Sequence, residues 1–204
     1  MEPTERNRRA WDAAHRRRRG AAGGGLPELV RGWLPDVRGR HVLHFPCGTG
    51  EATAELVALG ALVTALDPSE QAVGETRARV PAAAAVAGDP QRLPPELLRE
   101  RFHLVYAAEG TLALAQDLPA LARGAAAALR PGGFLLVHDE HPLAAHIDPL
   151  LHWRGSYFHA SRPTLAAAVT AVAQAGLVVR RLGELPAPSG NANLPGRFTL
   201  VARK

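Results

Sequence analysis

Short apolar runs alternate with longer amphipathic stretches from Arg40 to the end of the chain. Apolar runs of this kind, bounded by Gly, Pro or polar residues, are typical of buried strands, and the longer stretches are typical of helices. Gly60 and Ser69 stand where a helix C-cap and a helix N-cap are needed. The pattern predicts strands over residues 41–45, 61–66, 82–87, 102–107, 134–138, 177–182 and 198–202, and helices over residues 51–59, 68–80, 118–129 and 163–175.

The alternation of strands and helices indicates parallel βαβ units with right-handed crossovers. The last two predicted strands are joined only by the loop 183–196, without a helix. Strands joined in this way are expected to pair antiparallel. The predicted fold class is therefore α/β, with a doubly wound, mostly parallel seven-stranded sheet whose last strand is antiparallel. Such sheets bind ligands beyond the carboxyl ends of their strands, at the point where the strand order reverses.

The N-terminal segment differs from the rest of the chain. Residues 3–19 form a polar helical pattern with Trp11 as its one large apolar group, and residues 26–34 predict a short helix. We therefore divide the chain into an N-terminal helical segment over residues 1–35 and a core domain over residues 36–204.

The composition bears on the cellular location of the protein and on whether it contacts a membrane. Apolar residues make up 47% of the chain, which is ordinary for a globular protein. No apolar run is long enough for a membrane span, and the N-terminus lacks the apolar region of a signal peptide. Cys47 is the only cysteine, so an internal disulfide is impossible. The expected location is the cytoplasm, without a membrane contact.

The formal net charge of +5 comes almost entirely from arginine, and one cluster is local. It comprises Arg6, Arg8, Arg9 and residues 16–19. A basic arm of this kind can bind nucleic acid. However, Trp11 is the only aromatic residue among these arginines, and no recognition motif follows them. The favoured interpretation is a solvated helix, and RNA binding is kept as an alternative.

The stretch from Val42 to Glu51 carries the most chemical information. It predicts a strand, a turn with Gly48 and Gly50, and the start of a helix. Glycines in such a turn let a ligand press against the backbone. Asp67 ends the next predicted strand, about 20 residues later, where an acidic residue binds the hydroxyls of a ribose. Taken alone, the glycine turn fits a ligand-free tight turn equally well.

Two residues favour S-adenosylmethionine over NAD as the nucleotide. The dinucleotide fingerprint needs a third small residue where this chain has Thr53. It also places a diphosphate on the helix N-terminus, where the carboxylate of Glu51 would repel it. S-adenosylmethionine has no phosphate and carries a sulfonium and an ammonium, so Glu51 does not disfavour it.

The chain resembles the class I S-adenosylmethionine-dependent methyltransferases over residues 40–140. The resemblance rests on five segments in order: residues 47–50, 66–69, 88–94, 108–109 and 129–133. It implies a Rossmann-like methyltransferase fold with S-adenosylmethionine as the cofactor. The cofactor-binding residues that it implies are Phe45, Pro46, Cys47, Gly48, Gly50, Asp67, Pro68, Gly88, Asp89, Pro90, Ala108 and Glu109.

Three positions depart from the family pattern, which often has Asp at His103 and usually has a glycine at Pro46 and an acidic residue at His44. The carboxylate normally orders the loop and helps to hold the amino group of the cofactor, a role that histidine fills only if the role changes. Residues 7–12 look like the N-terminal lid helix of one branch of the family. By this resemblance, residues 1–35 are expected to close over the cofactor through Trp11, the alternative being a hydrophobic anchor.

Methyl transfer mainly requires orientation of two reactants and exclusion of water, and a general base only for poorly acidic acceptors. The candidate bases are His141 and Glu140, just past the fifth predicted strand, with pocket lining as the alternative role. His138, Asp139 and His146 are also close in sequence. They lack a zinc signature, and neighbours on a strand point to opposite faces, so no metal is expected.

Trp153, Tyr157 and Phe158 fall within one short segment without a clear strand or helix period. Flat amphipathic rings suit a pocket for an organic acceptor, and simple packing is the alternative. The Asp/Asn-Pro-Pro-aromatic signature of DNA amino-methyltransferases is absent. The predicted function is an S-adenosylmethionine-dependent methyltransferase that acts on a small molecule. The alternatives are a non-catalytic methyltransferase-like binding protein and an RNA methyltransferase.

Overall fold

The computed structural model describes residue 9 and residues 25–99, 101–148, 150–158, 162–187 and 193–204. The predicted helix over residues 3–19 lies outside these residues except for Arg9. The expectations for Trp11 and for the arginine cluster therefore stay predictions, and so does the boundary between residues 35 and 36.

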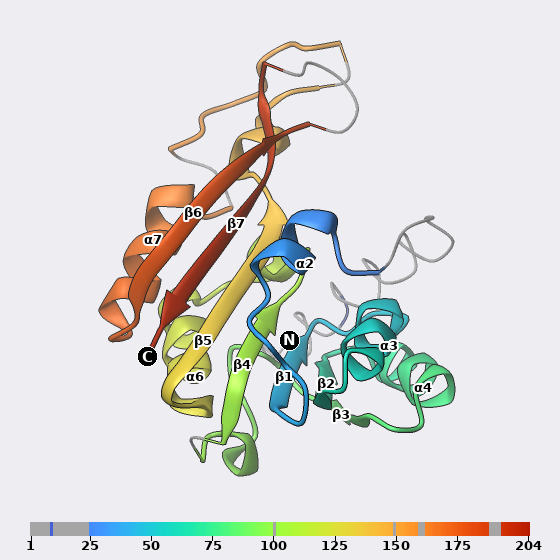
Figure 1. The fold of residues 1–204 in the computed structure, drawn as a ribbon. Helices are drawn as coiled ribbons and strands as arrows, with labels where there is room; N and C mark the ends of the chain where they lie inside the picture. Colours follow the sequence, from blue (N-terminus) through green and yellow to red (C-terminus); the bar gives the residue numbers. More distant parts are fainter. Residues whose placement is uncertain (1–8, 10–24, 100, 149, 159–161, 188–192) are drawn as a thin grey trace.

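A seven-stranded sheet forms the centre of the fold, with the strand order β3-β2-β1-β4-β5-β7-β6 (Figure 1). β1, β2, β3, β4 and β5 pair in parallel, and β7 is antiparallel to both β5 and β6. This confirms the predicted fold class. The strands are β1 His41–Phe45, β2 Leu62–Asp67, β3 Ala84–Ala87, β4 Phe102–Ala107, β5 Leu129–Glu140, β6 Val178–Pro186 and β7 Pro195–Arg203.

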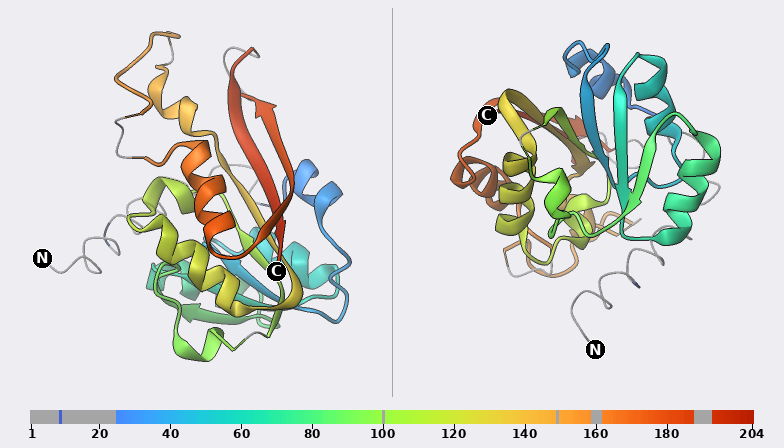
Figure 2. Two further views of the ribbon diagram at one scale, coloured as in Figure 1. Left: turned by 90° about the vertical axis from the view of Figure 1, so that its left-hand side faces the viewer. Right: turned by 90° about the horizontal axis from the view of Figure 1, so that it is seen from below.

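Helices cover both faces of the sheet (Figure 2). Within the described residues, no helix is long and apolar enough to cross a membrane. The helices are α2 Glu28–Trp33, α3 Glu51–Ala58, α4 Glu70–Arg79, α5 Thr111–Leu114, α6 Leu118–Ala128 and α7 Leu165–Gln174, with short 3₁₀ turns η1 Pro95–Leu97 and η2 Pro142–His146.

Alternation along the strands divides the core into two clusters. Leu43, Val105 and Leu135 point to the face covered by α6 and α7. Leu104 and Leu136 point to the opposite face, which α2 and α3 cover. Because successive strand side chains alternate in this way, the face reached by each residue at the strand ends follows from its position.

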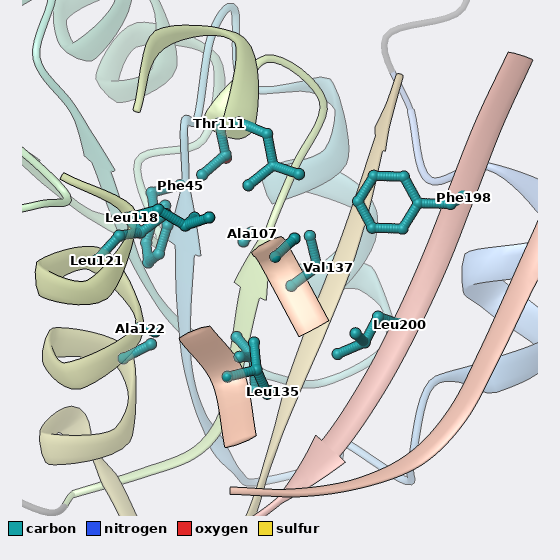
Figure 3. Close-up of a pocket in the computed structure, with 14 residues that line it drawn as sticks. Phe45, Ala107, Thr111, Leu118, Leu121, Ala122, Leu135, Val137, Phe198 and Leu200 are labelled. Atoms are coloured by element: carbon teal, nitrogen blue, oxygen red, sulfur yellow. The ribbon is translucent and has the colours of Figure 1, made fainter. Parts of the chain in front are cut away.

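A small cavity of about 30 Å³ lies in the first cluster, between the sheet and α6 and α7 (Figure 3). Its lining is almost entirely apolar, with the rings of Phe45 and Phe198 on opposite sides. Its size is about that of one water molecule in the liquid. It is a packing gap, too small for an organic acceptor.

The helix signals read from the sequence are confirmed. The Ser69 hydroxyl accepts a hydrogen bond from the Ala72 N–H at 3.3 Å and so caps α4. Gly60 has a φ of +88°, the left-handed conformation that glycine supplies after a helix. These local signals set the bounds of the two helices that flank the β1–β2 unit.

The structure differs from the prediction mainly at the last strands. β5 runs from Leu129 to Glu140 because it pairs with β4 on one side and with β7 on the other. Residues 131–133, a Pro-Gly-Gly sequence typical of a turn, lie inside this strand, at a register shift opposite Phe102 and Leu104. Glu140 pairs with Arg197, so it lies within the strand and not past it. α5 and both 3₁₀ turns were not predicted.

Trp33, at the end of α2, packs against Gly183 in β6. A Cβ atom at Gly183 would lie 2.7 Å from the Trp33 ring, and the guanidinium of Arg181 lies 3.9 Å from the centre of that ring. We expect Gly183→Ala to lower the free energy of unfolding by about 1–3 kcal/mol, because the ring has to move.

Gly74 provides the matched control. It lies inside α4, and a Cβ atom there would meet nothing within 4 Å. Gly74→Ala is expected to stabilise the protein by about 0.5–1 kcal/mol. Urea unfolding of both variants tests the pair. An unchanged stability of Gly183→Ala would mean that Trp33 does not pack as described.

Candidate cofactor and acceptor site

The loop after β1 contains two glycines, and the space around their Cα atoms differs. Gly50 has a φ of +87°, and a Cβ atom there would lie 3.1 Å from the Thr76 Cα. Gly48 has a φ of +55°, and a Cβ atom there would meet nothing within 4 Å. Gly50 is therefore needed for packing against α4, whereas Gly48 leaves open space over the loop where a ligand can reach the backbone.

α4 and β2 hold this loop in place. The Thr76 hydroxyl lies 3.0 Å from the Gly48 carbonyl oxygen and 3.3 Å from the Cys47 sulfur. The Cys47 N–H donates to the Leu66 carbonyl at 3.1 Å. Burial raises the pKa of the Cys47 thiol to about 12. Cys47 is therefore a neutral, packed side chain, and its backbone is the part that shapes the loop.

Asp67, at the end of β2, is 3% exposed and is bonded to the same loop. One carboxylate oxygen accepts from the Gly48 N–H at 3.0 Å and the other from the Ser69 N–H at 2.9 Å. An ionised carboxylate has about four acceptor positions and can bond several N–H or O–H donors at once. Asp67 is therefore a buried residue, although it stands at the end of a strand.

The first turn of α3 is less negative than the sequence suggested. Glu51 forms an ion pair with Arg79, with 3.0 Å between Oε1 and Nη2, and Thr49 donates its hydroxyl to the same carboxylate. Arg79 also donates from Nε to the Thr49 carbonyl at 2.6 Å. Glu51 is therefore weaker evidence against a diphosphate than Thr53. Thr53 is fully buried in the position that the dinucleotide fingerprint gives to a small residue.

His44 does not replace the family carboxylate electrostatically. Burial lowers its pKa to about 3, so the ring is neutral. Nδ1 lies 2.9 Å from the Thr53 hydroxyl, and the ring stacks on Tyr106 with 5.1 Å between centroids. The negative charge at this end of the sheet comes from other carboxylates, those of Glu51, Asp67, Asp89 and Glu109.

The segment after β3 lies beside the end of β2. The Gly88 N–H donates to the Asp67 carbonyl at 3.0 Å, which places Gly88 beside the end of β2. Asp89 accepts from the Gln91 N–H at 2.9 Å. Gln91 in turn accepts from the N–H groups of Gln116 and Asp117, both at 2.6 Å. This network connects the predicted adenine-binding segment to the start of α6.

The loop after β4 is fixed by a buried carboxylate. Asp139 is 1% exposed and accepts from the N–H groups of Gly110 at 2.8 Å, Leu112 at 2.7 Å and Glu140 at 2.7 Å. Ala108 donates its N–H to the Phe45 carbonyl at 2.7 Å, which joins the ends of β4 and β1. The predicted cofactor residues therefore lie on adjacent strand ends, at the point where the strand order reverses.

The two candidate bases are occupied by other contacts. His141 Nδ1 accepts from the Leu143 N–H at 3.1 Å and caps η2, and Nε2 lies 2.9 Å from a Glu184 carboxylate oxygen. Glu140 pairs with Arg162. A catalytic role for His141 or Glu140 stays a prediction.

The predicted acceptor residues gather around His146, in the segment at the top of Figure 1. Trp153 stacks on His146 at 5.9 Å, and Tyr157 meets His146 and Phe158 edge-on at 6.0 Å and 5.3 Å. Trp153 is 54% exposed and Phe158 is 80% exposed. An acceptor role for this cluster stays a prediction.

A cleft of about 1100 Å³ lies between α2 and the β5–β7 side of the sheet, and we call it the α2 cleft. Trp33 and the loop before α2 form one wall, and Arg181, Leu185 and Arg197 form the other. Glu109 and His138 also line it. The size matches pockets that bind organic ligands. Because Glu109 follows Ala108, this cleft opens next to the loop after β4.

His138 is the residue of the α2 cleft that the prediction missed as a candidate base. It was weighed only as a metal ligand. Among the described residues, no three His, Cys, Asp or Glu side chains are placed to hold a metal ion. Alternation along the strand already indicates from the sequence that His138 and Asp139 point to different faces of the sheet.

Known proteins share both the sequence pattern and the fold. Residues 42–133 match the family model described as methyltransferase domain. An uncharacterized methyltransferase of Synechocystis sp. is 36% identical over 107 residues, 50% of this chain and 48% of that protein. The S-adenosylmethionine-dependent methyltransferase from Mesorhizobium loti has a TM-score of 0.73 at 22% identity, covering 90% of this chain and 99% of that chain. A structure described for the conversion of a disulfide bond into a thioacetal group during echinomycin biosynthesis has a TM-score of 0.66 at 22% identity, covering 95% and 92%.

The chain spans about half the length of the curated relatives it matches. The matched part, residues 42–133, runs from β1 through β4. It includes the strand ends and loops that carry the carboxylates of Glu51, Asp67, Asp89 and Glu109. The fold agreement extends over most of the remaining chain. Residues 42–133 therefore match the methyltransferase domain family, and the chain has the fold of S-adenosylmethionine-dependent methyltransferases.

Proposed function

We propose that this protein transfers the methyl group of S-adenosylmethionine to a small-molecule acceptor. The observation that carries the proposal is the bond between Asp67 and Gly48, which holds an open glycine backbone beside a carboxylate at the end of β2. The α2 cleft, which Glu109 lines, gives an organic acceptor a place next to the loop after β4. A fold neighbour from echinomycin biosynthesis supports an organic acceptor for this architecture.

The residues present fit a cationic nucleoside better than a polyphosphate. Asp67 would hold the ribose hydroxyls, and Asp89 with the backbone after Gly88 would meet the adenine. The cofactor, when bound, supplies a methyl group already activated by a sulfonium. The remaining work of the protein is to orient the acceptor, exclude water and remove a proton where the acceptor carries one.

Calorimetric titration with S-adenosylhomocysteine and with NAD tests the cofactor part of this proposal. We expect heat of binding with S-adenosylhomocysteine and none with NAD, because Thr53 fills the position that the dinucleotide fold needs small. Equal affinities for the two compounds would contradict the cofactor assignment. An absence of heat with S-adenosylhomocysteine would instead favour a non-catalytic binding protein.

A further inference from the structure

His138 has an unusual combination of burial and missing hydrogen bonding. The side chain is 1% exposed, and Nδ1 lies 2.8 Å from the Thr199 hydroxyl on the neighbouring strand β7. Nε2 is buried and has no hydrogen-bond partner among the described residues. Buried polar atoms are nearly always paired, so an unpaired one in a side chain that lines a cleft indicates a ligand contact or a chemical role.

The other buried histidines do not share this placement. His44 Nε2 also lacks a partner among the described residues, but the His44 ring lies against Tyr106 and does not line the α2 cleft. His141 uses both ring nitrogens, on Leu143 and Glu184. Of these three rings, only that of His138 has an unpaired nitrogen and also lines the cleft.

We propose that His138 Nε2 is the general base that removes the proton from a hydroxyl or amine nucleophile bound in the α2 cleft. This inference rests on the proposed function. In the balanced step, the acceptor oxygen or nitrogen forms a bond to the methyl carbon and the carbon–sulfur bond breaks with its electron pair left on sulfur. The proton of the acceptor moves to His138 Nε2 and later leaves to solvent.

Burial favours the neutral form of the ring, which is the form that a base needs. Burial lowers the pKa of His138, Glu109 raises it and Arg197 lowers it. Glu109 and Arg197 form an ion pair with 3.1 Å between Oε2 and Nε, so their effects on the ring oppose each other. Arg181 is stacked on Trp33 across the cleft. The ring is therefore neutral at neutral pH and can accept a proton.

The tautomer of His138 tests the proposal without any acceptor. Long-range proton–nitrogen NMR spectra of protein with ¹⁵N-labelled histidine distinguish the two tautomers, and the His138→Gln spectrum assigns the signal. We expect a neutral ring at pH 7.5 with the proton on Nδ1, donated to Thr199, and a bare Nε2. A proton on Nε2, or a charged ring at this pH, would overturn the proposal.

Turnover provides the second test. We would incubate the protein with S-adenosylmethionine carrying a tritiated methyl group and with a panel of phenols, aliphatic alcohols and amines. His138→Gln is expected to lower kcat by roughly 100- to 10,000-fold on any acceptor that the unaltered protein methylates. The affinity for S-adenosylhomocysteine should stay within about threefold.

His103→Gln is the matched control, because His103 lies at the opposite end of the sheet, where Nδ1 accepts from the His41 N–H at 3.2 Å. It should keep both turnover and affinity. Loss of S-adenosylhomocysteine binding in the unaltered protein would refute the proposed function. Normal turnover by His138→Gln, with binding intact, would refute only the role of His138.

Discussion

Replacing Asp67 by alanine is expected to weaken the binding of S-adenosylhomocysteine by roughly 10- to 150-fold and to lower the melting temperature as well. The affinity loss follows from two charge-assisted hydrogen bonds to ribose hydroxyls, worth about 1.5–3 kcal/mol in total after exchange with water. Calorimetry on the folded variant measures this part.

The stability loss follows from the position of the carboxylate. The sequence alone suggested that the fold would be indifferent to this change, because strand ends are usually exposed. Asp67 is instead buried and satisfies the N–H groups of Gly48 and Ser69. Each buried N–H left unpaired costs about 1–3 kcal/mol, so for two groups the free energy of unfolding should fall by about 2–6 kcal/mol.

Ser69→Ala separates the two effects. It removes the cap on the Ala72 N–H and leaves the Asp67 carboxylate in place. We expect it to cost about 1 kcal/mol of stability and to leave the affinity unchanged. If Asp67→Ala also loses stability but keeps full affinity, Asp67 serves only the start of α4 and the ribose assignment is wrong.

The order and type of the main elements were predictable because each depends on local pattern. The apolar runs of β1, β2 and β4 and the caps at Gly60 and Ser69 were read correctly. The full length of β5 was not, because its extension to Glu140 depends on pairing with Arg197, far away in the sequence.

The candidate site was also predictable only in part. The glycine loop and Asp67 lie on adjacent elements with a fixed spacing, and the structure brings them together through the bond to Gly48. The roles of residues 138–141 depend on partners from later strands. His138 contacts Thr199, and His141 contacts Glu184. Sequence order contains no information about these pairs, so the contacts of His138 and His141 could not be predicted from it.

Asp139 is expected to be the most costly residue of this stretch to remove. Its carboxylate accepts from the N–H groups of Gly110, Leu112 and Glu140 in a fully buried position. Asp139→Ala leaves these donors without a partner, and we expect the free energy of unfolding to fall by about 3–5 kcal/mol. Glu140→Gln, on the exposed neighbour, should change it by less than about 1 kcal/mol.

The pH dependence of stability gives an independent test of the same carboxyl group. Burial raises the pKa of Asp139 from 3.8 to about 6, although its backbone hydrogen bonds act in the opposite direction. Because the folded pKa lies above the unfolded one, the folded state binds more protons between these values, and the contribution of Asp139 to stability is lost as the pH rises through about 6. The difference corresponds to about 3 kcal/mol. Urea unfolding from pH 4 to pH 7 should therefore show the unaltered protein losing up to about this amount relative to Asp139→Asn, whose amide does not titrate. Parallel pH profiles for the two proteins would mean that the backbone donors outweigh burial and that Asp139 is ionised throughout.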